Sequence, residues 1–202
     1  MSKNGTYISL HQRPFPKPNS KIDTEEFLAS CKDFVVLLDV LGKVFAPASY
    51  DMNGNIEKIN NVYETNCDKH KYLEDMVLGE RQEGNVLATD ALMWLRRGLT
   101  FLLEFFDGLC SNTEEETNIV VKKAYAKTLK KYHGWFASNL FSILTRIIPQ
   151  RTVLMKQLAL GKQDLDEMVL SDIKDFTFNL RLCINHLEAF YNEHGLETEI
   201  KV

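Results

Sequence analysis

The sequence lacks several features that mark common functional classes. It has no excess of positive charge, since 24 Lys and Arg residues stand against 28 Asp and Glu residues for a net charge of −4. This balance argues against nucleic acid as the main partner and against a polybasic membrane anchor. No apolar run approaches the ~20 residues that a membrane-spanning helix needs. The first residues also lack the apolar segment of a secretion signal.

The cysteines form no recognisable framework. Cys31, Cys67, Cys110 and Cys183 are widely separated, and no C-x-x-C pair occurs. Such spacing favours a reduced, intracellular protein without a zinc site. We therefore expect the protein in the cytosol.

Catalytic and cofactor motifs are missing as well. The chain contains no G-x-S-x-G, P-loop or G-x-G-x-x-G segment, and no Glu-x-x-His pair of the kind found in di-iron bundles. Asp51, Asn53 and Asn55 follow the spacing of a calcium loop, but Ile56 stands where that loop needs glycine and Val62 where it needs glutamate. The sequence predicts no metal and no cofactor.

No stretch alternates apolar and polar residues long enough to predict a strand. With 45% hydrophobic and 26% charged residues, the chain is typical of a globular all-α protein of seven or eight helices. Residues 1–21 are polar and contain three prolines, which predicts a flexible leader before one domain at 22–202. The helices are expected at about 23–41, 51–63, 68–78, 85–110, 114–133, 135–148, 153–160 and 164–191.

The longest helix-forming run is centred on Trp94. Gly98, Phe101 and Phe105 follow it at +4, +7 and +11, so they share its face at 3.6 residues per turn. A buried core helix is the ordinary explanation of such a stripe. The tryptophan has a polar edge, and Gly98 opens space beside the backbone between it and the phenylalanines.

A polar stripe precedes this helix. Asp51, Asn55 and Lys58 are spaced i, i+4 and i+7, which places an acid, an amide and an amine on one ridge. Together these groups can accept from and donate to several hydroxyls, as a sugar requires. A solvated helix face with Asp51 as its N-cap is the alternative.

His133 lies at the polar end of another apolar stripe. Leu129, Phe141 and Leu144 stand at −4, +8 and +11, if the helix continues through Gly134. A histidine there could bond a buried amide, although a satisfied core histidine is commoner.

Apolar residues beside cations mark a third place of interest. Trp135 begins one segment, and Ile147 and Ile148 end it between Arg146 and Arg151. Such a patch suits a membrane interface, and an ordinary helix–helix contact explains it equally well.

Taken together, three segments resemble the glycolipid transfer protein family, in the same order along the chain. They are Asp51–Lys58 with Val62–Asn66, then Ala91–Leu99, then Leu129–Trp135. The resemblance covers nearly all of the chain after residue 21. It implies a two-layer all-α sandwich that encloses one lipid.

The resemblance also implies roles for single residues. Trp94 would stack on the first sugar, while Asp51, Asn55 and Lys58 would bond its hydroxyls. Asp51 and His133 would hold the amide N–H and C=O of the ceramide. Trp135, with Ile147 and Ile148, would touch the membrane. The residues expected to line the space for the lipid chains are Leu37, Val44, Phe101, Phe105, Leu129, Phe141 and Leu144.

The expected function is transfer of a glycosphingolipid, such as galactosyl-, glucosyl- or lactosylceramide, between membranes by a monomer that touches them transiently. A ceramide-1-phosphate carrier is the alternative within the family, but those proteins have arginine at the positions of Trp94 and Asp90. An acid at position 90 would repel a phosphate. A glycolipid sensor that hardly transfers would have the same sequence. An enzyme with Asp51 and His133 as acid and base is the rival from another class.

Overall fold

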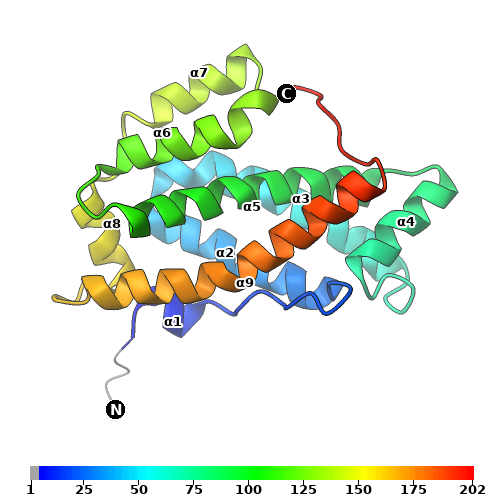
Figure 1. The fold of residues 1–202 in the computed structure, drawn as a ribbon, viewed down its shortest axis with the longest axis horizontal. Coiled ribbons are helices and arrows are strands. Elements are labelled where there is room, and N and C mark those ends of the chain that lie inside the picture. The colour runs from blue at the N-terminus through cyan, green and yellow to red at the C-terminus, as the bar shows by residue number, and fades with distance from the viewer. Residues whose placement is uncertain (1–4) are drawn as a thin grey trace.

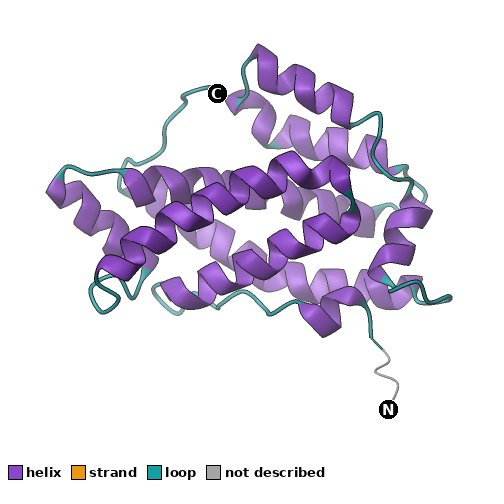
Figure 2. Cartoon of the chain, turned by 180° about the vertical axis from the view of Figure 1, so that it is seen from behind, coloured by secondary structure: helices purple, strands orange, loops and turns teal. Residues whose placement is uncertain are grey.

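The computed structural model describes residues 5–202, and helices make up its regular structure (Figure 1). No strand occurs in this described range, as the view from behind also shows (Figure 2). None of its helices is long and apolar enough to cross a membrane. The elements are α1 (Tyr7–His11), α2 (Thr24–Leu41), η1 (Lys43–Phe45), α3 (Ala46–Thr65), α4 (Leu73–Glu83), α5 (Leu87–Ser111), α6 (Thr117–Lys127), η2 (Leu129–Tyr132), α7 (Trp135–Leu144), α8 (Arg151–Leu158) and α9 (Asp166–Glu193).

Helix α5 organises the molecule. It packs against α3, α6 and α9, and α2 packs against α3. In Figure 1, α5, α6 and α9 form the front layer, and α2 and α3 lie behind them. Helix α7 lies beside α6 at one edge in both views (Figures 1 and 2). The predicted two-layer all-α sandwich is confirmed.

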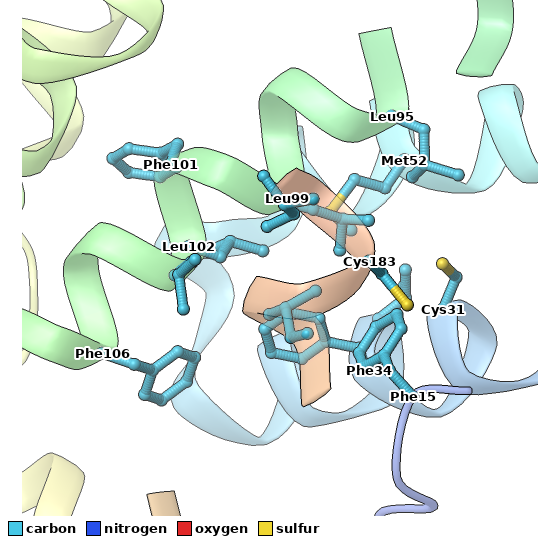
Figure 3. Close-up of a cluster of buried hydrophobic side chains, with 14 of the residues drawn as sticks. Phe15, Cys31, Phe34, Met52, Leu95, Leu99, Phe101, Leu102, Phe106 and Cys183 are labelled. Atoms are coloured by element: carbon cyan, nitrogen blue, oxygen red, sulfur yellow. The ribbon is translucent and has the colours of Figure 1, made fainter. Parts of the chain in front are cut away.

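Side chains from both layers meet in one hydrophobic core (Figure 3). Leu99 and Phe106 come from α5, Met52 from α3 and Phe34 from α2, and all four are nearly inaccessible to water. Fully burying a large apolar side chain contributes about 1.5–3 kcal/mol. The core therefore fixes α5 between the two layers and gives the site a rigid wall.

Residues 5–21, which the sequence predicts as a flexible leader, pack against the helices in the structure. Phe15 is buried, and its ring centroid lies 5.9 Å from that of Phe27 and 5.8 Å from that of Phe176. Thr6 caps α1 and donates a hydrogen bond to Asp172 on α9 at 2.6 Å. The prolines keep this segment extended, but its few apolar side chains supply burial that the composition did not reveal. Residues 1–4 lie outside the described range.

Two helix boundaries differ from the prediction in ways that matter for the site. Helix α3 begins at Ala46 with a proline in its first turn, so Asp51 lies inside the helix and is not its N-cap. The helix predicted over 114–133 ends at Lys127. A short 3-10 turn follows, and His133 then has an extended backbone, so the helix does not continue through Gly134.

Candidate ligand-binding site

An apolar cavity lies between α3, α5 and α7, and polar side chains stand at its edge. Its volume is about 200 Å³. The side chains with polar atoms that border it are Asp51 on α3, Trp94 on α5 and His133 just before α7. The remaining lining residues are Pro47, Ala48, Met52, Gly98, Phe101, Leu102, Leu129, Ala137, Leu140, Phe141, Leu144 and Val202.

Asp51 and Asn55 form a hydrogen-bonded pair one turn apart on α3. The Asn55 amide donates to the Asp51 backbone carbonyl at 3.0 Å and to its carboxylate at 3.3 Å. Part of the Asp51 side chain meets solvent, yet the cavity walls raise its pKa above the ordinary value, and Lys58 opposes this shift. The pair therefore offers a carboxylate acceptor whose direction is set by Asn55.

His133 is held by a tyrosine from α6. Its Nδ1 lies 3.2 Å from the Tyr125 hydroxyl oxygen, and that oxygen lies 3.2 Å from the Ser138 hydroxyl. Burial lowers the pKa of His133. The neutral ring, with one donor and one acceptor nitrogen, is therefore favoured at the cavity edge.

Trp94 is fixed in place by a cation beside it. The Arg97 guanidinium lies 4.8 Å from the Trp94 ring centroid and 3.6 Å from that of Tyr132. The two rings meet edge to face with centroids 6.2 Å apart. Cation–π contacts of this kind contribute about 0.5–2 kcal/mol. Trp94 is half-buried, so part of it stays accessible to a ligand.

The C-terminal segment binds to the same two arginines. Arg97 pairs with Glu197 at 3.0 Å and donates to the Thr198 carbonyl at 2.5 Å. Arg96 pairs with Glu197 as well. Burial lowers the pKa of both guanidinium groups.

The end of the chain then reaches the cavity. The Gly134 N–H donates to the Val202 carbonyl oxygen at 2.6 Å, and the Val202 N–H donates to the Tyr132 carbonyl at 3.0 Å. Figure 1 shows this end of the chain beside α6 and α7. This role of residues 197–202 was not predicted, although two adjacent arginines, Arg96 and Arg97, in an apolar helix indicate that a counter-ion is needed.

A smaller cavity of about 70 Å³ adjoins the first. Phe101, Phe141 and Leu144 border both cavities, and Val44 borders the smaller one. These four residues and Leu129, which borders the larger cavity, therefore border a cavity. Leu37 and Phe105 do not, since both are fully buried in the core and border neither cavity. Helical spacing placed Phe105 on an apolar face and the family resemblance implied Leu37, but neither could show which side chains meet the cavity.

Helix α7 presents apolar side chains to solvent. Trp135 is 82% exposed, Phe136 is 76% exposed, and Ile147, just beyond the helix, is 65% exposed. Ile148 is half-buried and borders the smaller cavity. Two of the three residues predicted to touch a membrane are therefore exposed.

An all-α sandwich with an apolar cavity and a polar edge defines a lipid-binding protein. The family model described as Glycolipid transfer protein (GLTP) matches residues 22–160. Glycolipid transfer protein A of Xenopus laevis is 34% identical over 95% of this chain and 97% of its own. The chain belongs to the glycolipid transfer protein family, whose members carry lipids and are not enzymes.

Other relatives and solved structures agree with this assignment. Human pleckstrin homology domain-containing family A member 8 is 35% identical over 90% of this chain, which spans 37% of that protein. A solved structure of FAPP2, which selects simple glycosphingolipids using the GLTP fold, matches with a TM-score of 0.84 and 31% identity over 100% of this chain and 98% of its own. Mouse ceramide-1-phosphate transfer protein shares the fold with a TM-score of 0.81 at 20% identity, covering 94% of this chain and 93% of its own.

Proposed function

We propose that this protein binds a glycosphingolipid and transfers it between membranes. The observation that carries the proposal is the apolar cavity with Asp51, Trp94 and His133 at its edge. An acceptor, a flat aromatic face and a neutral imidazole suit a sugar joined to an amide. The lipid chains would occupy the apolar interior.

Affinity and selectivity would come from different parts of this site. Each buried CH₂ contributes about 0.8 kcal/mol, so the chains supply affinity whatever head they carry. A buried donor or acceptor left unpaired costs about 1–3 kcal/mol. Asp51 and His133 would therefore favour a lipid with an amide N–H and C=O, and Trp94 would favour one with a sugar face.

The cavities are smaller than the proposed ligand. Volumes of about 200 Å³ and 70 Å³ fall below the roughly 300–1,000 Å³ that holds a drug-sized ligand. None of the side chains of α7 is fully buried. We infer that α7 moves outward to admit two lipid chains, because it has the least packing to lose.

The exposed side chains of α7 would also meet the membrane. Trp135, Phe136 and Ile147 form an apolar edge beside the cavity, and a tryptophan is favoured at headgroup depth. A lipid could then pass from the bilayer into the cavity without crossing water. We place this activity in the cytosol and assign it to a monomer.

The test is transfer between vesicles of labelled galactosylceramide beside labelled ceramide-1-phosphate. Fast transfer of the sugar lipid alone is expected, and preferred transfer of the phosphate lipid would contradict the proposed head site. A parallel binding measurement separates a carrier from a sensor. Tight binding of galactosylceramide without transfer would overturn the carrier function.

A further inference from the structure

The two adjacent arginines of α5 are buried with too few acceptors. Arg96 is 5% exposed and Arg97 is 3% exposed. Both pair with Glu197, which is their acidic partner in the described part of the chain. The Nε atoms of both arginines and the Nη1 atom of Arg97 have no hydrogen-bond partner there. A buried charged donor without an acceptor is costly, so a ligand with several acceptor oxygens would be favoured at this place.

Two adjoining hollows lie beside these arginines. Arg96 and Glu197 border one of about 340 Å³, and Arg96 and Arg97 border one of about 120 Å³. Lys131 and Tyr132 border both, and we call the two hollows together the arginine recess. The larger volume lies within the range of ordinary small-molecule sites. The recess shares no lining residue with the apolar cavity, so it is separate from the proposed lipid site.

Charges of both signs surround the arginine recess. Besides the arginines and Glu197, the charged residues that border it are Lys127, Lys131, Lys201, Glu188 and Glu199. Lys131 is exposed and makes no ion pair within residues 5–202. Because the acids weaken any general attraction, an anion would be held here by direct contact with the guanidinium groups. Arginine N–H groups match phosphate oxygens in both geometry and charge.

Glu197 belongs to the C-terminal segment, which runs from the end of α9 towards α6 and α7 without a helix of its own (Figure 1). Its pairing with the two arginines holds the beginning of this segment. Val202 lies at the other end, where it borders the apolar cavity and hydrogen-bonds to Gly134 and Tyr132. A ligand that took the arginines from Glu197 would therefore loosen a segment that reaches the cavity.

We propose that Arg96 and Arg97 form a binding site for a phosphate monoester, and that Glu197 occupies this site when the ester is absent. The dianion of such an ester has three terminal oxygens, whereas a carboxylate has two. It can therefore accept from the arginine N–H groups that Glu197 leaves unpaired. Its binding releases the C-terminal segment. The chemistry of the site suits a soluble ester or the head of a phosphorylated lipid, and it does not depend on a bound glycosphingolipid.

The first part of the test uses a soluble ester. Calorimetry measures binding of glycerol 3-phosphate at constant ionic strength and above pH 7, where the ester is mostly a dianion. Glu197→Gln removes the competing carboxylate and should bind the ester more than about fivefold more tightly than the wild-type protein does. Glu199→Gln is the matched control, because it removes the same charge from the same segment without unpairing an arginine. This control should change the affinity by less than about twofold.

A pair of lysines tests the same site without a change in the C-terminal segment. Lys131→Gln removes a cation that borders the recess and should weaken binding of glycerol 3-phosphate about two- to fivefold. Lys130→Gln removes the neighbouring exposed lysine, which does not border the recess, and should leave the affinity unchanged. Hydrogen exchange in the wild-type protein should become faster at residues 197–202 when the ester binds, because the hydrogen bonds of Val202 are then lost.

The second part of the test asks whether the ester is the head of a lipid. Vesicle sedimentation compares vesicles that contain phosphatidic acid, a phosphate monoester, with vesicles of equal surface charge that contain phosphatidylglycerol, a diester. A preference for phosphatidic acid that is reduced in Lys131→Gln but not in Lys130→Gln would support the site with a lipid head as its ligand. Binding of glycerol 3-phosphate without this preference would support the site with a soluble ester as its ligand.

Three results would overturn the inference. Binding of neither glycerol 3-phosphate nor phosphatidic acid would show that the arginines serve the C-terminal segment alone. Equal tightening in Glu197→Gln and Glu199→Gln would show a general effect of charge. Unchanged hydrogen exchange at residues 197–202 when the ester binds would show that the ester and Glu197 do not compete. All of these measurements are made without a glycolipid, so their failure is distinct from a failure of the proposed transfer function.

Discussion

The two helices on either side of the cavity are packed very differently. Fifteen of the 25 residues of α5 are buried, including Arg96 and Arg97, whereas none of the ten residues of α7 is. Both helices supply lining residues, among them Phe101 from α5 and Phe141 from α7. Helix α5 therefore forms a wall of the cavity that the core holds in place. Helix α7 forms another wall, which is weakly packed.

This contrast suggests that α5 and α7 have different roles in binding a lipid. Recognition of a small polar head needs groups held in place, and Trp94 on α5 is held by Arg97 and Tyr132. Admission of long chains needs a wall that moves at little cost, which the weak packing of α7 provides. Changes to α5 and α3 should therefore alter which lipid binds, and changes to α7 should alter how fast it passes.

The strongest test of the fixed side is the loss of its head-binding groups. Trp94→Ala removes the aromatic face, and Asp51→Val removes the acceptor beside Asn55. Asp51→Val should reduce galactosylceramide transfer more than about fivefold, because one unpaired polar group costs about 1–3 kcal/mol. Trp94→Ala should reduce it to a similar extent, because the sugar loses the aromatic face on which it packs. Vesicle transfer assays measure the effect, and circular dichroism checks that the helices remain.

Glu57→Val is the matched control for Asp51→Val. Glu57 is an exposed acid on the same helix and does not line the cavity. This control should transfer galactosylceramide at nearly the wild-type rate. Normal transfer by either Trp94→Ala or Asp51→Val would refute the assignment of the head site.

Changes to the exposed side chains of α7 should alter how strongly the protein contacts membranes. Trp135→Ala removes the most exposed aromatic side chain of α7 and should slow transfer several-fold by weakening contact with vesicles. Vesicle sedimentation measures that contact directly. Phe178→Ala, which changes an exposed aromatic residue on α9, is the control and should leave partitioning unchanged. Unaltered partitioning of Trp135→Ala would count against the membrane role of α7.

The contrast between the two helices was only partly readable from the sequence. The apolar period around Trp94 predicted a long buried helix, and α5 matches it closely because burial on one face dictates the period. The helix predicted over 114–133 ends earlier, at Lys127, since local propensity could not show that His133 lies in an extended stretch beside Tyr125.

Long-range contacts were beyond local patterns altogether. The polar ridge of Asp51 and Asn55 was visible because its spacing lies within one helix. The pairing of Arg97 with Glu197 joins residues a hundred positions apart. Nothing in either local segment specifies such a partner, so the contribution of the C-terminal segment emerged only from the fold.

The ion pairs of Arg96 and Arg97 with Glu197 can be removed to test how firmly α5 holds Trp94. Glu197→Gln leaves two buried guanidinium groups without their carboxylate, which should lower the free energy of unfolding by about 1–3 kcal/mol. Galactosylceramide transfer should fall about two- to threefold, because Arg97 then holds Trp94 less firmly. Glu199→Gln, an exposed neighbour in the same segment, should change neither quantity. Denaturant unfolding measures the first quantity and vesicle transfer assays measure the second. Equal unfolding free energies for Glu197→Gln and Glu199→Gln would contradict a stabilising role of Glu197.

The smallest expected effect is the pH dependence of stability that comes from His133, which borders the cavity just before α7. Burial lowers its pKa from the ordinary value of 6.5. The unfolded chain then takes up this proton more readily than the folded one, so the contribution to stability is complete above pH 6.5 and is lost as the pH falls. Because the ring is half-buried and partly screened, the loss between pH 7.5 and 5 should be less than about 1 kcal/mol. His133→Gln should lack that loss, so its unfolding free energy should fall less than that of the wild-type protein between pH 7.5 and 5. An equal pH dependence of unfolding free energy in both proteins would show that His133 is solvated and is not held between α6 and α7.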